Sequence, residues 1–177
     1  DTLVVCLGKA QPKSLDPGVS NTRQVLTLYH NWGDTLLYRD PVSGGIVPGL
    51  AASYRILDNG DMELTLRKGG KFHNGEPFNG AAIKFSLDLL KKSDSKVSRY
   101  LANIEDVVVL DDHHVRIEVF KPIPTLSQLI ANVLFIYPPG YYRKVGKAEY
   151  GRHPVGTGPY RLVSNKGFSE MAFERNP

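Results

Sequence analysis

An alternating segment that follows a tight turn constrains the fold of this chain more than any other feature. Met62, Leu64 and Leu66 are separated by single polar residues, so a strand here has one apolar face and one solvent-exposed face. The preceding residues 58–60 (DNG) tolerate the positive φ angles of a hairpin turn. The pattern therefore predicts a β-hairpin in which residues 53–57 pair with residues 61–67.

A helical period begins shortly after this hairpin. Asn79 is placed to cap a helix with one broad apolar stripe, while Lys84, Asp88 and Lys91 mark its polar face. The residues of the stripe are Ala82, Ile83, Phe85, Leu87, Leu89 and Leu90. The segment before the helix, residues 72–80 (FHNGEPFNG), combines two turn signals. We therefore predict a sharp joint between the hairpin and the helix.

Strand and helix patterns are mixed along the rest of the chain. Further hairpins are predicted at 107–119 and 160–174, and a buried strand at 2–7. The remaining predicted helices cover 25–32, 125–131 and 141–147. No internal repeat or low-complexity segment interrupts them. The predicted fold class is therefore a mixture of α and β elements.

Composition limits the class of protein. The chain has 177 residues, of which 41% are hydrophobic and 23% charged, so it should fold as one domain or two small ones. Its single cysteine, Cys6, excludes an internal disulfide and lies in an apolar run typical of a buried thiol. No apolar run is long enough to span a membrane, and the first residues lack a signal-peptide layout. Both a cytosolic protein and a secreted one without its leader remain open.

A net charge of +4 and a pI near 9.1 make nucleic acid a partner to test. The basic residues are spread through the chain with acidic residues nearby, and no zinc-finger, RNA-binding or basic-zipper signature is present. We therefore expect no nucleic-acid partner.

Motifs for catalysis or metal binding are also missing. The five histidines show no metal-ligand spacing, and no Gly-x-Ser-x-Gly elbow appears. The run Gly156, Thr157, Gly158 lacks the lysine of a phosphate loop and predicts a tight crossing of backbone instead. Asp16 and Asp40 precede prolines and are interpreted as turn formers. The residues predict no enzyme, no metal site and no cofactor.

Six segments in a fixed order carry a resemblance to a known family. They are 14–17 (SLDP), 47–54 (VPGLAASY), 64–78 (LTLRKGGKFHNGEPF), 107–121, 154–160 (PVGTGPY) and 174–177 (ERNP). In this order they resemble the family 5 extracellular solute-binding proteins, which are the peptide-, nickel- and oligosaccharide-binding receptors of bacterial ABC importers. The resemblance implies that residues 72–80 form the turn before a helix that packs on the hairpin, and that His73 is structural.

The chain departs from the family in three respects. It lacks a tryptophan near Tyr54, and residues 80–83 (GAAI) replace an acidic pair at the start of the helix. Neither position is expected to contact ligand. Family members also continue past a segment such as 175–177 into a third domain. The resemblance therefore implies that this chain is an N-terminal piece of a longer receptor.

The architecture implied by the resemblance is the class II periplasmic-binding-protein fold. Residues 1–40 and 151–177 would form parts of a discontinuous domain I, and residues 41–150 an inserted α+β domain II. Solute would be trapped between domain I and the third domain by hinge closure.

The same resemblance suggests where solute binds. Val19, Ser20, Asn21, Thr22 and Arg23 would face the cleft, and Arg99 and Tyr100 would reach it from the inserted domain. The alternatives are a plain surface loop with a helix cap for the first group, and a solvated arginine and a core tyrosine for the second.

The implied function is that of a receptor for di- or oligopeptides. It would be periplasmic or lipid-anchored, act as a monomer without catalysis, and deliver solute to the transmembrane subunits of an ABC permease. A nickel-chelate or oligosaccharide receptor remains open within the family. A surface interaction protein without a transport role and a hydrolase are the alternatives from other classes.

Overall fold

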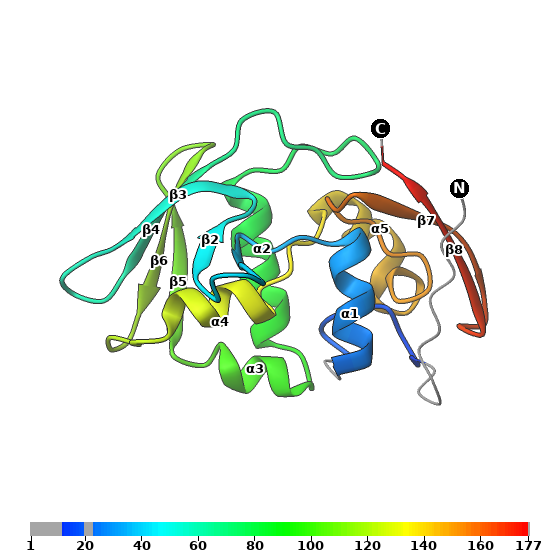
Figure 1. Cartoon of the computed structure of the whole chain (residues 1–177), viewed down its shortest axis with the longest axis horizontal. Coiled ribbons are helices and arrows are strands. Elements are labelled where there is room, and N and C mark those ends of the chain that lie inside the picture. Colours follow the sequence, from blue (N-terminus) through cyan, green and yellow to red (C-terminus); the bar gives the residue numbers. More distant parts are fainter. Residues whose placement is uncertain (1–11, 20–22, 177) are drawn as a thin grey trace.

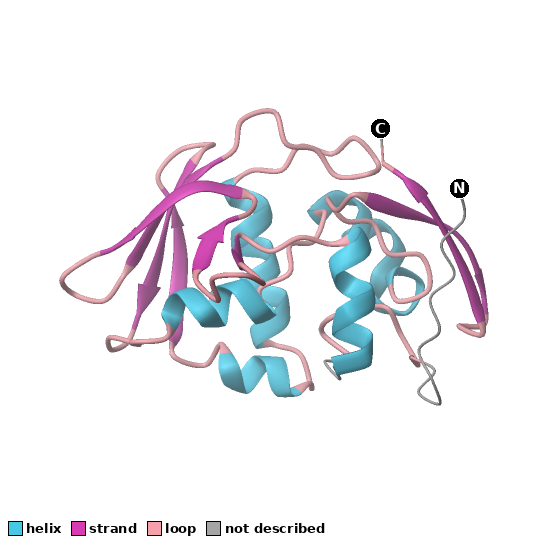
Figure 2. Ribbon diagram, viewed as in Figure 1, coloured by secondary structure: helices cyan, strands magenta, loops and turns pink. Residues whose placement is uncertain are grey.

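The computed structural model describes residues 12–19 and 23–176. A four-stranded sheet lies at one end of the molecule and a two-stranded hairpin at the other, with helices between them (Figures 1 and 2). The predicted strand at 2–7 and the loop residues 20–22 lie outside the described residues.

The four-stranded sheet is built from the first two predicted hairpins. Its strands are β3 (Ala51–Ile56), β4 (Met62–Leu66), β5 (Ile104–Val109) and β6 (His114–Val119). They are arranged in the order β3-β4-β6-β5, and each neighbouring pair is antiparallel. Met62, Leu64 and Leu66 are at most 2% exposed, so the predicted alternation of β4 is confirmed.

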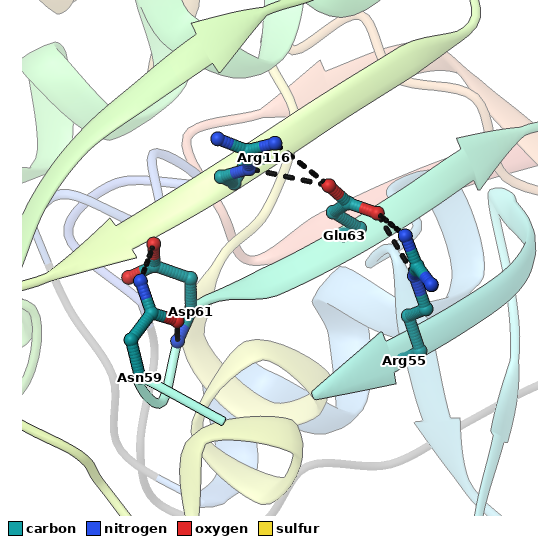
Figure 3. A network of polar contacts seen from close by, with 5 residues as sticks. All are labelled: Arg55, Asn59, Asp61, Glu63 and Arg116. Carbon is teal, nitrogen blue, oxygen red and sulfur yellow. Dashed lines mark hydrogen bonds and ion pairs between the residues drawn. The ribbon is translucent and has the colours of Figure 1, made fainter. Parts of the chain in front are cut away.

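The solvent-exposed face of the sheet carries a row of charges (Figure 3). Glu63 stands opposite Arg55 on one side and Arg116 on the other. Its Oε2 accepts from Arg55 Nε at 2.9 Å, and its Oε1 accepts from Arg116 Nη2 at 2.8 Å. Below this row, Asp61 Oδ1 accepts from Val119 N at 3.1 Å and ties the turn of the first hairpin to the end of β6.

The helix α2 (Gly80–Lys91) covers the sheet next to β5, as its stripe predicts. Asn79 Oδ1 accepts from Ala82 N at 3.2 Å, so the predicted N-cap is confirmed. Ile83, Leu87 and Leu90 are fully buried. On the polar face Lys84 Nζ donates to Asp106 Oδ2 at 2.6 Å, which links the helix to β5.

The joint formed by residues 72–80 also holds two distant segments. Glu76 accepts from Gly140 N and Tyr141 N, both at 2.8 Å, at the start of the helix α5 (Pro139–Tyr150). His73 Nε2 contacts Gly158 O at 2.9 Å, and its backbone N donates to Gly156 O at 2.8 Å. Burial lowers the pKa of His73, which favours the neutral ring. The prediction of a structural histidine is confirmed.

The tight backbone crossing predicted at Gly156 and Gly158 is present. Gly158 N donates to Trp32 O at 3.0 Å, at the end of the helix α1 (Arg23–Trp32). A Cβ added at Gly156 would lie 2.2 Å from Trp32 O. Glycine is therefore required by the close approach of two backbones.

The remaining predicted elements are also present. The helix α4 (Leu126–Val133) covers the segment predicted at 125–131, and α5 includes 141–147 with a break at Gly146 (φ 76°). The last hairpin pairs β7 (Tyr160–Lys166) with β8 (Glu170–Arg175). No helix in the ranges 12–19 and 23–176 has the length and apolar character needed to cross a bilayer.

Three short elements were not predicted. They are α3 (Lys96–Tyr100) and the paired strands β1 (Leu37–Arg39) and β2 (Ile46–Pro48). The residues between β1 and β2 form a turn in which Asp40 Oδ1 accepts from Val42 N at 3.0 Å and Ser43 N at 2.6 Å. Asp40 is therefore the turn former that the sequence predicts, but strands of three residues are too short to show a period.

Candidate functional site

Four of the residues predicted to bind solute lie in the described part of the chain: Val19, Arg23, Arg99 and Tyr100. Val19 is 40% exposed at the end of the described part of its loop. Ser20, Asn21 and Thr22 lie outside the described residues, and Arg23 begins α1.

The second predicted group lies on α3. Arg99 and Tyr100 are both exposed, with Tyr100 at 52%. The alternative of a core tyrosine is therefore wrong, whereas a solvated arginine agrees with the exposure of Arg99. Val97 anchors α3 in the core at 2% exposed, and Ser95 Oγ caps it by accepting from Val97 N at 3.2 Å.

The helix α3 and the first turn of α1 lie along the same edge of the molecule in Figure 1. Within the described ranges, no hydrogen bond or ion pair joins Val19 to Arg99 or Tyr100. Val19, Arg99 and Tyr100 are thus each open to solvent, and a solute contacting Val19 and Tyr100 together would have to bridge them.

A hollow of about 450 Å³ lies next to Val19. Its lining side chains include three cations and no carboxylate: Lys13, Lys147 and Arg152. These residues come from the loop before Asp16 and from the end of α5 and the turn that follows it. Sequence analysis missed this grouping, because positions 13, 147 and 152 show no common local pattern.

The loop that carries Val19 is held by a buried aspartate. Asp16 is only 1% exposed, and its Oδ1 accepts from Gly18 N at 2.8 Å and from Tyr137 Oη at 2.7 Å. Its Oδ2 accepts from Tyr142 Oη at 3.4 Å. The interpretation of Asp16 as an ordinary turn former is therefore corrected: it forms the turn through Gly18 and also binds two distant tyrosines.

Burial dominates the electrostatics of this aspartate. It raises the pKa of Asp16, while the hydrogen bonds from Tyr137 and Gly18 and the charge of Lys147 act in the opposite direction. Burial and the neighbouring carboxylate raise the pKa of Tyr142, so its phenol keeps its proton.

Aromatic rings surround the aspartate. The ring centroids of Tyr137 and Tyr142 are 5.4 Å apart, and those of Tyr142 and Tyr150 are 5.0 Å apart. Leu15 N donates to Gly151 O at 2.8 Å and fastens the start of the loop to the end of α5. The loop is thus fastened by hydrogen bonds to Gly151, Tyr137 and Tyr142, and the side chain of Val19 after it is exposed.

No group of three or more histidine, cysteine, aspartate or glutamate side chains within the described part of the chain could hold a metal ion.

Comparison with solved structures shows the class of protein to which this fold belongs. NikZ from Campylobacter jejuni, solved in complex with Ni(L-His), matches with a TM-score of 0.82 and 25% identity over 94% of this chain and 34% of that chain. OppA from Haemophilus influenzae, solved with the peptide RPPGFSPFR, matches with a TM-score of 0.86 and 24% identity over 95% of this chain and 37% of its own. The fold is that of class II periplasmic binding proteins, as the resemblance predicts.

The sequence comparison then gives the family. The sequence model described as "Bacterial extracellular solute-binding proteins, family 5 Middle" matches residues 45–177. The chain belongs to this family. A curated relative, the glutathione-binding protein GsiB of Salmonella choleraesuis, is 38% identical over 117 residues, which are 64% of this chain and 23% of the relative. The chain thus spans about a quarter of the length of such relatives, which are solute-binding proteins and not enzymes.

Proposed function

We propose that this chain is part of an extracytoplasmic receptor that binds di- or oligopeptides for an ABC importer. The observation that carries the proposal is membership of the family 5 solute-binding proteins over residues 45–177. The preference for a peptide rests on the 38% identity to a protein named as glutathione-binding, because glutathione is a small peptide.

The chain would supply one wall of a solute-binding cleft. Residues 1–40 and 151–177 would belong to domain I and residues 41–150 to the inserted domain II. Solute would contact the loop from Val19 to Arg23, with Arg99 and Tyr100 at its edge. The exposure of Val19 and Tyr100 supports this proposal, since both side chains are accessible for contact with a solute.

The receptor would act outside the cytoplasm, in the periplasm or attached to the outer face of the membrane. It would act as a monomer and pass its solute to the transmembrane subunits of an ABC permease, without chemistry of its own. A permease gene beside the gene for this protein would favour transport over a surface interaction role.

A nickel-chelate receptor is the second candidate. The similarity to NikZ, solved with Ni(L-His), favours it at 25% identity over 94% of the chain. Calorimetry of the whole receptor with glutathione, a panel of dipeptides and nickel–histidine distinguishes the two. Binding of the nickel complex alone would contradict the peptide proposal.

Replacing Tyr100 by alanine in the whole receptor tests the proposed edge of the cleft. We expect a loss of affinity for glutathione of about tenfold, because an aromatic ring that packs on a ligand contributes on the order of 1–2 kcal/mol. The melting temperature should change little, since this side chain is 52% exposed.

Phe120→Ala is the matched control, because Phe120 is an exposed aromatic residue that the proposal does not place at the cleft. Its affinity for glutathione should stay unchanged. A Tyr100 variant that keeps full affinity, or that loses stability instead, would refute the assignment.

A further inference from the structure

The loop from Ser14 to Val19 is buried from Leu15 to Gly18 and reaches the surface at Val19. It places a carboxyl group in the interior: Asp16 is 1% exposed, whereas Val19, three residues later, is 40% exposed. Burying a carboxylate is costly unless hydrogen bonds satisfy it, so its partners indicate what the arrangement is for.

The side-chain partners of Asp16 come from two parts of the fold. Gly18 N, in the loop itself, donates to Oδ1 at 2.8 Å. Tyr137, in the segment before α5, donates to the same oxygen at 2.7 Å, and Tyr142 in α5 donates to Oδ2 at 3.4 Å. All three partners are donors, which suits an acceptor-only carboxylate.

The backbone of the loop is held from a third direction. Tyr29 Oη, in α1, donates to Asp16 O at 2.9 Å, and Val19 N donates to the same oxygen at 2.9 Å. Gly18 N also lies 3.0 Å from Tyr137 Oη, so this amide is shared between the aspartate and the tyrosine. The aspartate therefore connects α1, α5 and the amides of Gly18 and Val19.

We propose that Asp16 is the positioning residue of the solute-binding loop: its buried carboxyl group holds the amide of Gly18 and ties it to Tyr137 and Tyr142, which sets the position of the next residue, Val19, for contact with solute. This inference rests on the proposed function, because it assumes that Val19 contacts solute. Asp16 does not touch the solute itself. It acts by keeping an exposed segment ordered before solute arrives, which removes an entropic cost from binding.

A purely structural role would also explain a buried aspartate, so the two must be separated. If Asp16 only stabilises the fold, its loss lowers the melting temperature without a specific change at the loop. If it positions the loop, its loss removes the carboxylate acceptor of the Gly18 amide and the link from the loop to Tyr137 and Tyr142, and weakens binding at temperatures where the protein stays folded.

The test uses the whole receptor with three substitutions: Asp16→Ala, Asp16→Asn and Tyr137→Phe. Hydrogen exchange of the Gly18 amide and calorimetry with glutathione are measured on each, well below its melting temperature. For Asp16→Ala we expect exchange at least about tenfold faster and a glutathione Kd raised by about tenfold or more.

The other two variants keep the test informative. Asn keeps one acceptor oxygen for Gly18 and Tyr137, and its amide can donate to Tyr142 Oη, so Asp16→Asn should restore both readouts to within about threefold. Tyr137→Phe keeps the ring and removes a donor to Oδ1, so both readouts should lie between those of wild type and Asp16→Ala. If Asp16→Ala does not fold, Tyr137→Phe is used as the variant that weakens the bonds of the Asp16 carboxylate.

Unchanged exchange in the variants overturns the inference, and so does faster exchange with unchanged affinity. Failure of the proposed function is a different result: the unmodified receptor would then bind no glutathione and none of the dipeptides.

Discussion

At the scale of single residues, the backbone of residues 156–158 can cross the end of α1 closely because Gly156 and Gly158 have no Cβ. A Cβ at Gly156 would lie 2.2 Å from Trp32 O, and one at Gly158 would lie 2.6 Å from Trp32 C. These atoms belong to the backbone at the end of α1, so they cannot rotate away as a side chain could. The same crossing supplies the carbonyl that His73 contacts.

Gly156→Ala should therefore destabilise the protein. We expect the free energy of unfolding to fall by roughly 1–3 kcal/mol, because the added methyl group forces α1 and the crossing segment apart. Urea unfolding of the chain measures this. The control is Gly45→Ala, where the added atom would meet only the exposed Ser43 Oγ, at 3.3 Å. Equal losses in the two variants would contradict the argument.

At the scale of elements, side-chain capping distinguishes the start of α2 from the start of α4. Asn79 bonds the first turn of α2, whereas Thr125, in the corresponding position before α4, makes no such bond. The sequence signal at Asn79 was sufficient to predict the cap, because the bond involves a residue only three positions away.

Asn79→Ala should lower the free energy of unfolding by about 1 kcal/mol, since it removes the side-chain acceptor that the Ala82 amide of the first turn shares with the backbone carbonyl of residue 79. Thr125→Ala is the matched control and should have little effect. Chemical denaturation of both variants under identical conditions provides the comparison. A loss at Thr125 as large as that at Asn79 would show that capping is not the cause.

The charged row on the sheet gives a prediction for pH. Hydrogen bonds from Arg55 and then Arg116 lower the pKa of Glu63 below its ordinary value. A lowered pKa means that the ionised form is favoured in the folded state. Its contribution to stability is therefore present above the pKa of the unfolded chain and is lost as the pH falls through the lowered value.

The stability difference between wild type and Glu63→Gln should follow this rule. We expect it to be largest near neutral pH, to close below about pH 4, and to shrink in high salt, where exposed ion pairs are screened. Unfolding curves across this pH range measure it. Glu118→Gln, on the neighbouring strand and without an ion pair among the described residues, is the control variant. A stability difference between wild type and Glu63→Gln that does not change with pH would contradict this prediction.

At the scale of the whole molecule, the proposal is that this chain supplies one wall of the cleft. Val19 and Tyr100 are open to solvent, and the chain spans 23% of the length of its glutathione-binding relative. A solute that contacts both walls in the closed receptor would contact only one here.

The isolated chain should therefore bind glutathione at least about 100-fold more weakly than the whole receptor, a loss of about 3 kcal/mol. Calorimetry on both proteins measures this, and circular dichroism of the chain verifies that it is folded. Equal affinities would refute the view that a second wall is needed.

The sequence by itself determined those elements whose signals are local. The alternation at Met62, Leu64 and Leu66, the cap at Asn79 and the turn at Asp40 each involve residues a few positions apart, and all three are present in the structure. The family, too, could be read from the order of short segments, and the family model matches residues 45–177.

Only the tertiary structure decided how the candidate site is supported. Asp16 meets Tyr137 across 121 positions of sequence, and no local pattern announces such a contact. The exposure of Tyr100 depended in the same way on a short helix, α3, that the sequence did not predict. The physical reason is that periodicity reports which face of an element is apolar, whereas the fold determines which distant groups that face and its loops will meet.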